Sequence, residues 1–460
     1  AAQDLPHNLT DDEKNRLHEI GRNLTITDPP DSILYAPAEF DSIAGILFAW
    51  EAYTTLLIQL VKEVAEEDTA WVVVDNTSEQ NSVFNTLNNA NVNMNHVVFE
   101  VVPTNSVWIR DYGPWWIYEP DNRRAIIDLT YNRPRPQDDA FPELFAENFG
   151  VSYYGLGLIE AGGNMLLDGK GAVIISDVVF DASQGFDPDL TEQQLRQYFL
   201  DYFGIHKVII TPHLINDGTG HIDMFVKIVN DTTIIVGEYE NQAAGYPGNY
   251  DICNQVANQL ANETNGVGRP FNIVRMPMPP YNNGITYTYV NSLLVNNKIL
   301  VPIYGFNDSF ANDVDILSQY EEIIPGSEAI GFDCNQIIAA NGAIHCITMK
   351  VPAMLEMISC GNSLGDINLD QKINIFSIGL IAICFLVAGL PWVFSAFEKP
   401  GFTELTFTPV RYKSSLDKQS IDIFSDSSKL LSSIYIGWPI INFTINRSEE
   451  HTSELQSLVN

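Results

Sequence analysis

Basic residues are scarce in this chain. Its 460 residues include 24 Lys and Arg against 58 Asp and Glu, so the formal net charge at pH 7 is −34. Proteins bind nucleic acid and anionic lipid through clustered cations. The composition therefore argues against both as partners, and it is typical of a protein surface that stays soluble in salty or extracellular surroundings.

Several short motifs are also missing. The five cysteines form no C-x-x-C pair, which argues against a zinc or redox motif, and their odd number leaves at least one free or paired between chains. The sequence has no Walker or Rossmann motif for a nucleotide cofactor. It begins AAQDLPHNLT, without Met or an apolar signal core. This beginning suits a mature secreted, bacterial-type protein whose signal peptide has been removed, although a fragment would look the same.

The length predicts two or three domains. Residues 1–40 carry turn formers such as TDPPDS and are expected to form an N-terminal arm that packs on the following domain. From 41 to 355, short β-branched runs alternate with helix-like stretches, which is typical of an α/β domain. One such stretch, LTEQQLRQYFLDYFG, has Thr191 as an expected N-cap and Gly204 as an expected stop.

A turn rich in Asp, Asn, Gly and Lys precedes a strand three times, in LDGKGAVIISD, VNDTTIIVGEY and VNNKILVPIY. Recurring hairpins of this kind suggest a pseudo-symmetric array of similar modules with loops around one central site. Ordinary hairpin chemistry explains the pattern equally well.

Groups capable of catalysis occur in four segments of this domain. The stretch SVWIRDYGPWWIYEP, residues 106–120, places a carboxylate in an aromatic wall. GTGHIDMF sets a histidine and an aspartate two residues apart ahead of an apolar strand, where positions i and i+2 would face the same way. YVNSLLV and NGAIHCITMKVP add an amide and a thiol. The candidate residues are Asp111, His221, Asp223, Asn291 and Cys346.

These groups fit one chemistry, although a lone cysteine is often buried core. Cys346 would be the nucleophile, and His221 would hold the thiolate or shuttle protons. Two carboxylates exceed what a Cys–His pair needs for orientation. They make sense if the substrate is a guanidinium, which carboxylates bind through its donor fork and which Trp108 would stack against.

The ordered set WIRDYGPWW, EAGGNMLLDGKG, GHID and IHCIT resembles the Porphyromonas-type peptidyl-arginine deiminases, within the guanidino-group-modifying enzymes. The likeness covers roughly residues 5–355. It implies a five-module β/α propeller with a central site. Asp111 and Asp223 would bind the guanidinium, His221 would be the general acid and base, Cys346 the nucleophile, and Asn291 part of the site wall. Neither a metal nor an organic cofactor would be required, and the product would be citrulline.

The segment YNRPRPQDD bears on the substrate. Pro134 and Pro136 are expected to hold it extended, with Arg133 and Arg135 on one side. Two such arginines could clamp a carboxylate, or they could be solvated residues of a rigid loop. The matching arginines of the resembled family read the carboxylate of a C-terminal arginine. The segment DGTG before His221 is closer to the agmatine type, and Arg110 is expected to be structural.

A new unit begins near residue 363. In LGDINLDQKINIF, calcium-loop positions are occupied by Asp366, Asn368, Asp370 and Asn374. Residues 363–398 therefore resemble one dockerin repeat, a weak Ca²⁺ site with Ser377 where a carboxylate is expected, and a surface for a protein partner. Alternatively, the uncharged run 376–397 could span a bilayer. Residues 399–460 form an unassigned tail, whose end, RSEEHTSELQSLVN, looks like translated adapter sequence.

The leading hypothesis is a secreted deiminase acting on C-terminal arginine of peptides or proteins. An agmatine deiminase producing N-carbamoylputrescine is the alternative. An amidinotransferase would need an amine-acceptor site, for which no signal is visible. A non-catalytic binding protein, with the calcium-like module as its contact surface, would have no use for a paired thiol and imidazole.

Overall fold

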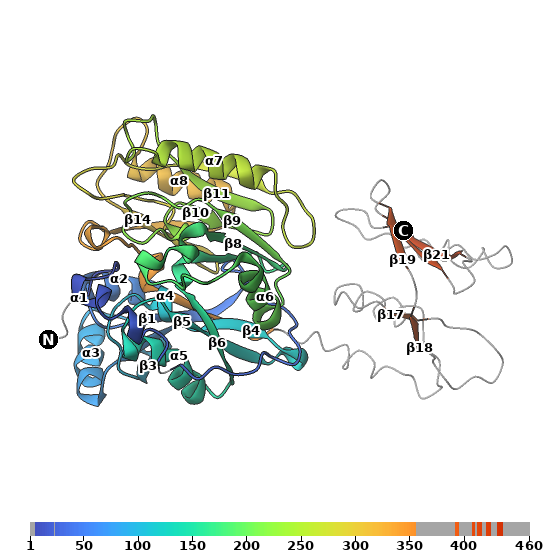
Figure 1. The fold of residues 1–460 in the computed structure, drawn as a ribbon, viewed down its shortest axis with the longest axis horizontal. Coiled ribbons are helices and arrows are strands. Elements are labelled where there is room, and N and C mark those ends of the chain that lie inside the picture. Colours follow the sequence, from blue (N-terminus) through green and yellow to red (C-terminus); the bar gives the residue numbers. More distant parts are fainter. Residues whose placement is uncertain are drawn as a thin grey trace. The chain divides into compact units, whose positions relative to one another are not determined.

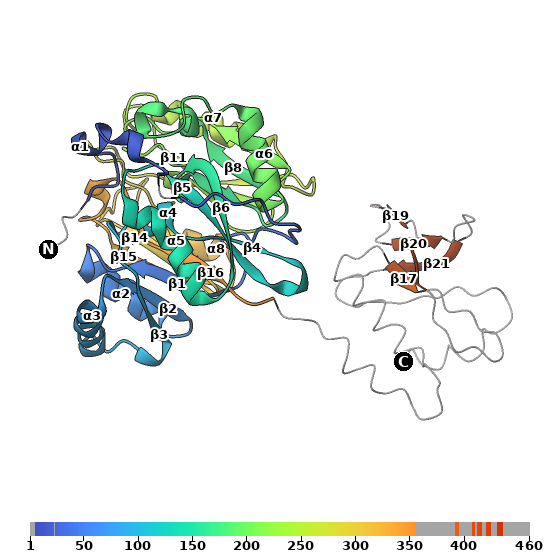
Figure 2. The same ribbon diagram turned by 60° about the horizontal axis from the view of Figure 1, so that its bottom comes forward.

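The computed structural model describes residues 5–22, residues 24–355 and five short strands beyond them. The chain divides into two compact units, Ala1–Leu355 and Glu356–Asn460. In both ribbon views of the first unit, the helices α3 (Thr77–Asn89), α6 (Glu192–Phe203) and α7 (Asn249–Ala261) lie at the periphery, and most strands lie inside (Figures 1 and 2).

Four sheets of the first unit repeat one pattern, in which a hairpin is followed by a helix and a parallel third strand. The strands and helices are β4 (Trp115–Tyr118), β5 (Arg124–Tyr131), α5 (Pro136–Phe149) and β6 (Ser152–Glu160); β7 (Met165–Leu167), β8 (Ala172–Ser176), α6 and β9 (Lys207–Thr211); β10 (Val226–Ile228), β11 (Thr233–Glu238), α7 and β12 (Asn272–Pro277); and β13 (Leu293–Val295), β14 (Lys298–Ile303), α8 (Asp313–Ile323) and β15 (Glu328–Asp333).

The remaining sheet of this unit joins the two ends of the domain. Its order is β16-β1-β2-β3, and β1 (Ile43–Ala49) pairs antiparallel with β16 (Met349–Pro352). Helix α2 (Thr54–Val64) leads from β1 to β2 (Thr69–Val74), and α3 leads from β2 to β3 (Val97–Val101). The five sheets are compatible with the predicted five-module propeller.

Local sequence chemistry explains much of this arrangement. Thr191 caps α6 through a capping box, and Gly204 ends the helix at φ 67°, as predicted. The three recurring turns are the hairpins β7–β8, β10–β11 and β13–β14. In two of them a turn side chain, Asp168 or Asn230, accepts backbone N–H bonds from residues just after it.

The second unit is described through five short strands. Strands β17 (Trp392–Phe394) and β18 (Phe407–Pro409) pair antiparallel, as do β19 (Tyr412–Ser415), β20 (Ser420–Phe424) and β21 (Leu430–Tyr435) in a separate sheet. Among the residues that the structure describes, no helix has both the length and the apolar character needed to cross a membrane. The predicted calcium ligands Asp366, Asn368, Asp370 and Asn374 lie outside the described residues, and the 376–397 run does so apart from β17.

Candidate active site

The aromatic wall carries Asp111 on a single helical turn. Helix α4 (Ile109–Tyr112) starts directly after Trp108 and ends at Gly113, where an added Cβ would lie 2.3 Å from the Ile109 carbonyl oxygen. A glycine at this position lets the chain turn into β4. Both Trp108 and Asp111 are buried, so the carboxylate lies inside the protein as the sequence predicts.

His221 and Asp223 reach the same interior region, by a different local route from the expected one. The sequence pattern predicted that they share one face ahead of a strand. In the structure, Asp223 lies on the short 3-10 helix Ile222–Met224, His221 precedes that helix, and β10 begins only at Val226. The His221 Nδ1 atom is 3.5 Å from Asp111 Oδ1, and neither nitrogen of its buried ring makes a hydrogen bond.

Cys346 lies on a second 3-10 helix, His345–Ile347, just before β16. Its Sγ is 3.4 Å from Asn291 Oδ1 and 4.0 Å from Asp223 Oδ2. The Asn291 side chain also donates to the Asp223 carbonyl oxygen, at 3.4 Å. Asp223 keeps its other carboxylate oxygen, Oδ1, without a hydrogen-bond partner. The structure thus brings the five predicted catalytic residues to one place, while their roles stay predictions.

Gly163, which sequence reasoning missed, leaves the opening among these groups. A Cβ at this position would lie 2.6 Å from His221 Nδ1, 3.0 Å from Asp111 Oδ1 and 3.3 Å from Asp223 Oδ2. Any side chain would therefore fill the space that the three polar groups share. The signal that could have found it is the Gly162-Gly163 pair between two strands, since a glycine inside a strand pattern often marks a close approach.

Burial sets the charge states of the catalytic candidates. Burial, together with the nearby carboxylates Asp223 and Asp111, raises the pKa of Cys346 well above its usual value, so the resting side chain is a thiol. Burial lowers the pKa of His221 to about 4 against the opposing effect of Asp111, so the imidazole is neutral at pH 7. Burial opposes ionisation of Asp111, but the neighbouring imidazoles of His7 and His221 and the hydrogen bond with His7 outweigh it, so its pKa is lowered.

Glu39, whose carboxylate sequence reasoning also missed, holds Asp223 in place through His345. His345 Nδ1 is 2.6 Å from Asp223 Oδ2, and His345 Nε2 contacts Glu39 Oε2. The other oxygen of Glu39 accepts from Lys227 Nζ at 2.7 Å. The imidazole between two carboxylates holds Asp223 through Oδ2, the oxygen near Gly163, and leaves Oδ1 without a hydrogen-bond partner. Arg110 donates to the His345 carbonyl oxygen and approaches Glu39 at 3.6 Å, which confirms its predicted structural contacts.

The arginine pair is placed differently from the prediction. The segment is not extended, because the Arg135 N–H donates to the Arg133 carbonyl oxygen and α5 begins at Pro136. Both side chains are buried, which excludes the alternative of solvated arginines. Arg135 Nε is 2.7 Å from Glu13 Oε1. Arg133 donates to three carbonyl oxygens, of His7, Asn132 and Gln184, and its Nη2 has no partner.

The N-terminal arm also enters the site, a contact the sequence did not reveal. His7 Nε2 lies 2.7 Å from Asp111 Oδ2. The possible ligand atoms of His7, Asp111 and His221 all lie within 4.8 Å of one another, so these three residues could hold a metal ion. In the structure, Asp111 uses one oxygen for His7 and turns the other toward His221 and the N–H of Gly163.

Comparisons with known proteins agree with this geometry. A profile of the Porphyromonas-type peptidyl-arginine deiminase family matches residues 36–352. A Selenomonas ruminantium protein that is provisionally named agmatine deiminase is 25% identical to this chain over 369 residues. These residues are 70% of this chain and 96% of the relative.

Solved structures show the same α/β fold. An agmatine deiminase of Enterococcus faecalis has a TM-score of 0.63 at 20% identity and covers 72% of this chain and 100% of its own. A Porphyromonas gingivalis protein provisionally named arginine deiminase has a TM-score of 0.60 at 22% identity, covering 69% of this chain and 98% of its own. The profile match spans well over half of the sequence. The chain thus belongs to the Porphyromonas-type peptidyl-arginine deiminase family and is a guanidino-group deiminase, a hydrolase of amidine C–N bonds that needs no cofactor for catalysis.

Proposed function

We propose that the protein hydrolyses the guanidinium group of arginine at the C-terminus of a peptide, giving citrulline and ammonia. Arg133 carries this proposal. Its guanidinium is buried, its Nη2 has no partner, and no carboxylate within residues 5–22 and 24–355 forms an ion pair with it. A buried cation without a counter-charge is costly. The terminal carboxylate of a peptide would supply that charge in a bidentate geometry.

We assign the first half of the reaction to four residues. The guanidinium would enter the opening at Gly163 and pair with Asp111 and Asp223, whose Oδ1 and Oδ2 atoms border that opening. Its positive charge would favour the thiolate of Cys346, whose proton would pass to the neutral His221. The sulfur would then attack the guanidinium carbon. The C–N bond would break with the proton returned by His221, and ammonia would leave a thiouronium on Cys346.

The second half would use a water molecule. His221, neutral again, would take a proton from water as the oxygen attacks the thiouronium carbon. The C–S bond would break, the thiol would be restored, and the carbon would keep the oxygen as a ureido group. The balance is one guanidinium and one water converted to one urea group and one ammonium ion. Asn291 would hold the sulfur of Cys346 in line through their 3.4 Å contact.

Agmatine is the second candidate substrate, because several relatives carry the name agmatine deiminase, provisionally. Agmatine lacks the carboxylate, and it bears a charged ammonium group where C-terminal arginine has the nitrogen of its peptide bond. A cation near the buried guanidinium groups of Arg133 and Arg135 would meet repulsion, whereas a carboxylate would be attracted. We therefore place the peptide ahead of agmatine. Secretion and a calcium-dependent partner of the C-terminal module remain predictions.

Three guanidines distinguish these functions. The purified protein is offered a peptide ending in arginine, the same peptide amidated, and agmatine, and the ureido product and ammonia are measured with Cys346→Ala as the blank. We expect the free-carboxylate peptide to have the highest kcat/KM. Arg133→Ala should lower that value by about one to two decades, corresponding to a charge-assisted hydrogen bond, and leave the amidated peptide unchanged. A preference for agmatine would overturn the proposal.

A further inference from the structure

The N-terminal arm places a buried imidazole ring in the centre of the candidate site. His7 is fully buried and stacks on the indole of Trp108, with ring centroids 4.2 Å apart and planes 10° apart. The ring of His221 approaches it edge-on at 5.2 Å. Its Nε2 is 2.7 Å from Asp111 Oδ2, and its Nδ1 is 2.7 Å from the carbonyl oxygen of Asn341.

These contacts put the ring of His7 in the place of a substrate group. A carbonyl oxygen can only accept, so Nδ1 donates to Asn341. The ring's other nitrogen, Nε2, contacts a carboxylate oxygen of Asp111. His7 is therefore a planar ring stacked on Trp108 and bonded to Asp111, which are the contacts expected for a guanidinium.

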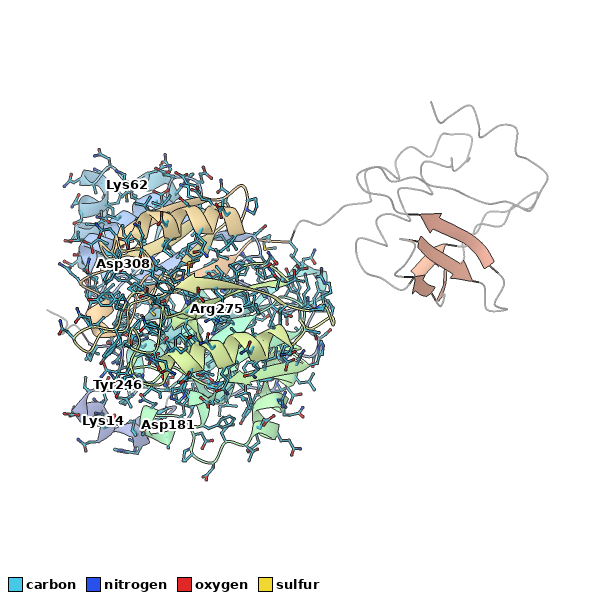
Figure 3. All side chains as sticks on the ribbon, turned by 90° about the horizontal axis from the view of Figure 1, so that it is seen from above. Lys14, Lys62, Asp181, Tyr246, Arg275 and Asp308 are labelled. Carbon is cyan, nitrogen blue, oxygen red and sulfur yellow. The ribbon has the colours of Figure 1, made fainter. Side chains whose placement is uncertain are left out.

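The same arm places a carboxylate on the arginine pair. Glu13 Oε1 and Oε2 lie 2.7 and 3.4 Å from the Nε and Nη2 atoms of Arg135. The carbonyl oxygens of Pro6 and His7 accept from Arg135 Nη2 and Arg133 Nε. Helix α1 (Asp11–Lys14) fixes Glu13, because Thr10 and Glu13 form a capping box. Lys14 of the same helix lies at the margin of the unit (Figure 3).

We propose that the arm is an internal stand-in for the substrate, and that His7 and Glu13 are specificity-determining residues. The inference rests on the proposed function, since it takes the His7 ring at Asp111 and the Glu13 carboxylate beside the Arg133 and Arg135 pair as stand-ins for the two ends of a C-terminal arginine. A substrate with both charges replaces both arm contacts. A guanidine without a carboxylate can replace His7 but not Glu13, so moving the arm aside for it would leave Arg135 without a counter-charge.

Two single variants separate these roles. His7→Ala removes the competing ring, so KM should fall for every guanidine, by about tenfold or more for a lost hydrogen bond to the Asp111 carboxylate. Glu13→Gln removes the competing charge and keeps the capping box, which accepts Gln at this position. It should lower KM for the free-carboxylate peptide alone. The matched arm variants His18→Ala and Asp11→Asn should match wild type, since the exposed Asp11 side chain pairs with Lys14 and not with the arginine pair.

Binding to the Cys346→Ala protein, followed by calorimetry, tests the arm without turnover. His7→Ala in this background should tighten binding of the arginine-ending peptide about tenfold or more. Turnover by wild type with an unchanged or raised KM in His7→Ala would overturn the arm inference and leave the proposed function standing. Tighter binding to the His7→Ala protein, with no turnover by any variant, would overturn the proposed function and leave the arm inference standing. No binding with or without His7 would overturn both.

Discussion

Replacing Gly163 by alanine should remove activity by filling the opening between the catalytic groups. The new methyl carbon would lie 2.6 Å from His221 Nδ1, whereas ordinary contact begins at 3.4 Å, so the imidazole must move by about 0.8 Å (3.4 − 2.6). Asp111 must give way as well, since its Oδ1 would be 3.0 Å away. A misplacement near 1 Å costs about 10²-fold in rate, so kcat/KM should fall by about two decades or more.

The assay is ammonia release from the arginine-ending peptide, with thermal unfolding measured in parallel. Gly163 lies outside the left-handed region of φ, so alanine meets no backbone strain there. Gly157→Ala is the matched control, because its Cβ would approach only the side chain of Ile26, at 3.1 Å, and activity should stay within about twofold. A folded Gly163→Ala protein with activity within about threefold of wild type would refute the reasoning.

Three further results follow from the charge states of the site. Cys346→Ala and Cys346→Ser should abolish ureido product with an unchanged melting temperature; product from the folded alanine variant contradicts the nucleophile assignment. Cationic 2-chloroacetamidine should alkylate Cys346 at pH 7 at least about tenfold faster than neutral 2-chloroacetamide, because the raised pKa keeps Cys346 a thiol until a positive charge arrives. Both rates are followed by mass spectrometry, and equal rates would contradict activation of the thiol by the bound cation. Burial raises the pKa of Glu160 from 4.5 to about 8, so the folded protein binds a proton that the unfolded chain releases, and stability is lost as pH rises from about 4.5 to 8. Glu160→Gln should remove this loss, raising the unfolding free energy by roughly 3.5 kcal/mol at pH 7 (2.5 pH units at about 1.4 kcal/mol each); the same gain at pH 5 would contradict this account.

Features governed by nearby residues could be predicted from the sequence. The ends of α6 follow from a threonine and a glycine at its boundaries, and the three hairpins follow from turn residues beside β-branched runs. The catalytic candidates could also be predicted, because each type of side chain has a distinct chemical use and the short motifs resemble one family. The local backbone around His221 and Asp223 could not be predicted, since the same apolar residues are compatible with a 3-10 helix and with the start of a strand.

Contacts that join distant parts of the chain could not be predicted from the sequence. His7 contacts a carboxylate 104 residues away, and His345 contacts Glu39 across 306 residues. A histidine in a polar arm has no periodic pattern to suggest that it is buried. The two prolines near Arg133 were expected to extend the segment, but proline also suits the first turn of a helix, and α5 begins at Pro136. Tertiary packing decided between the two conformations.

The pairing of β1 with β16 has a consequence for the order in which a ribosome makes this protein. Cys346 lies three residues before β16, so the strand that closes the first sheet and the predicted nucleophile are synthesised almost together, after the other catalytic candidates. A nascent chain that stops earlier lacks the thiol and leaves β1 as an unpaired edge, which is prone to aggregation. Completing the domain and adding the predicted nucleophile are therefore one event, and unfinished chains lack that thiol.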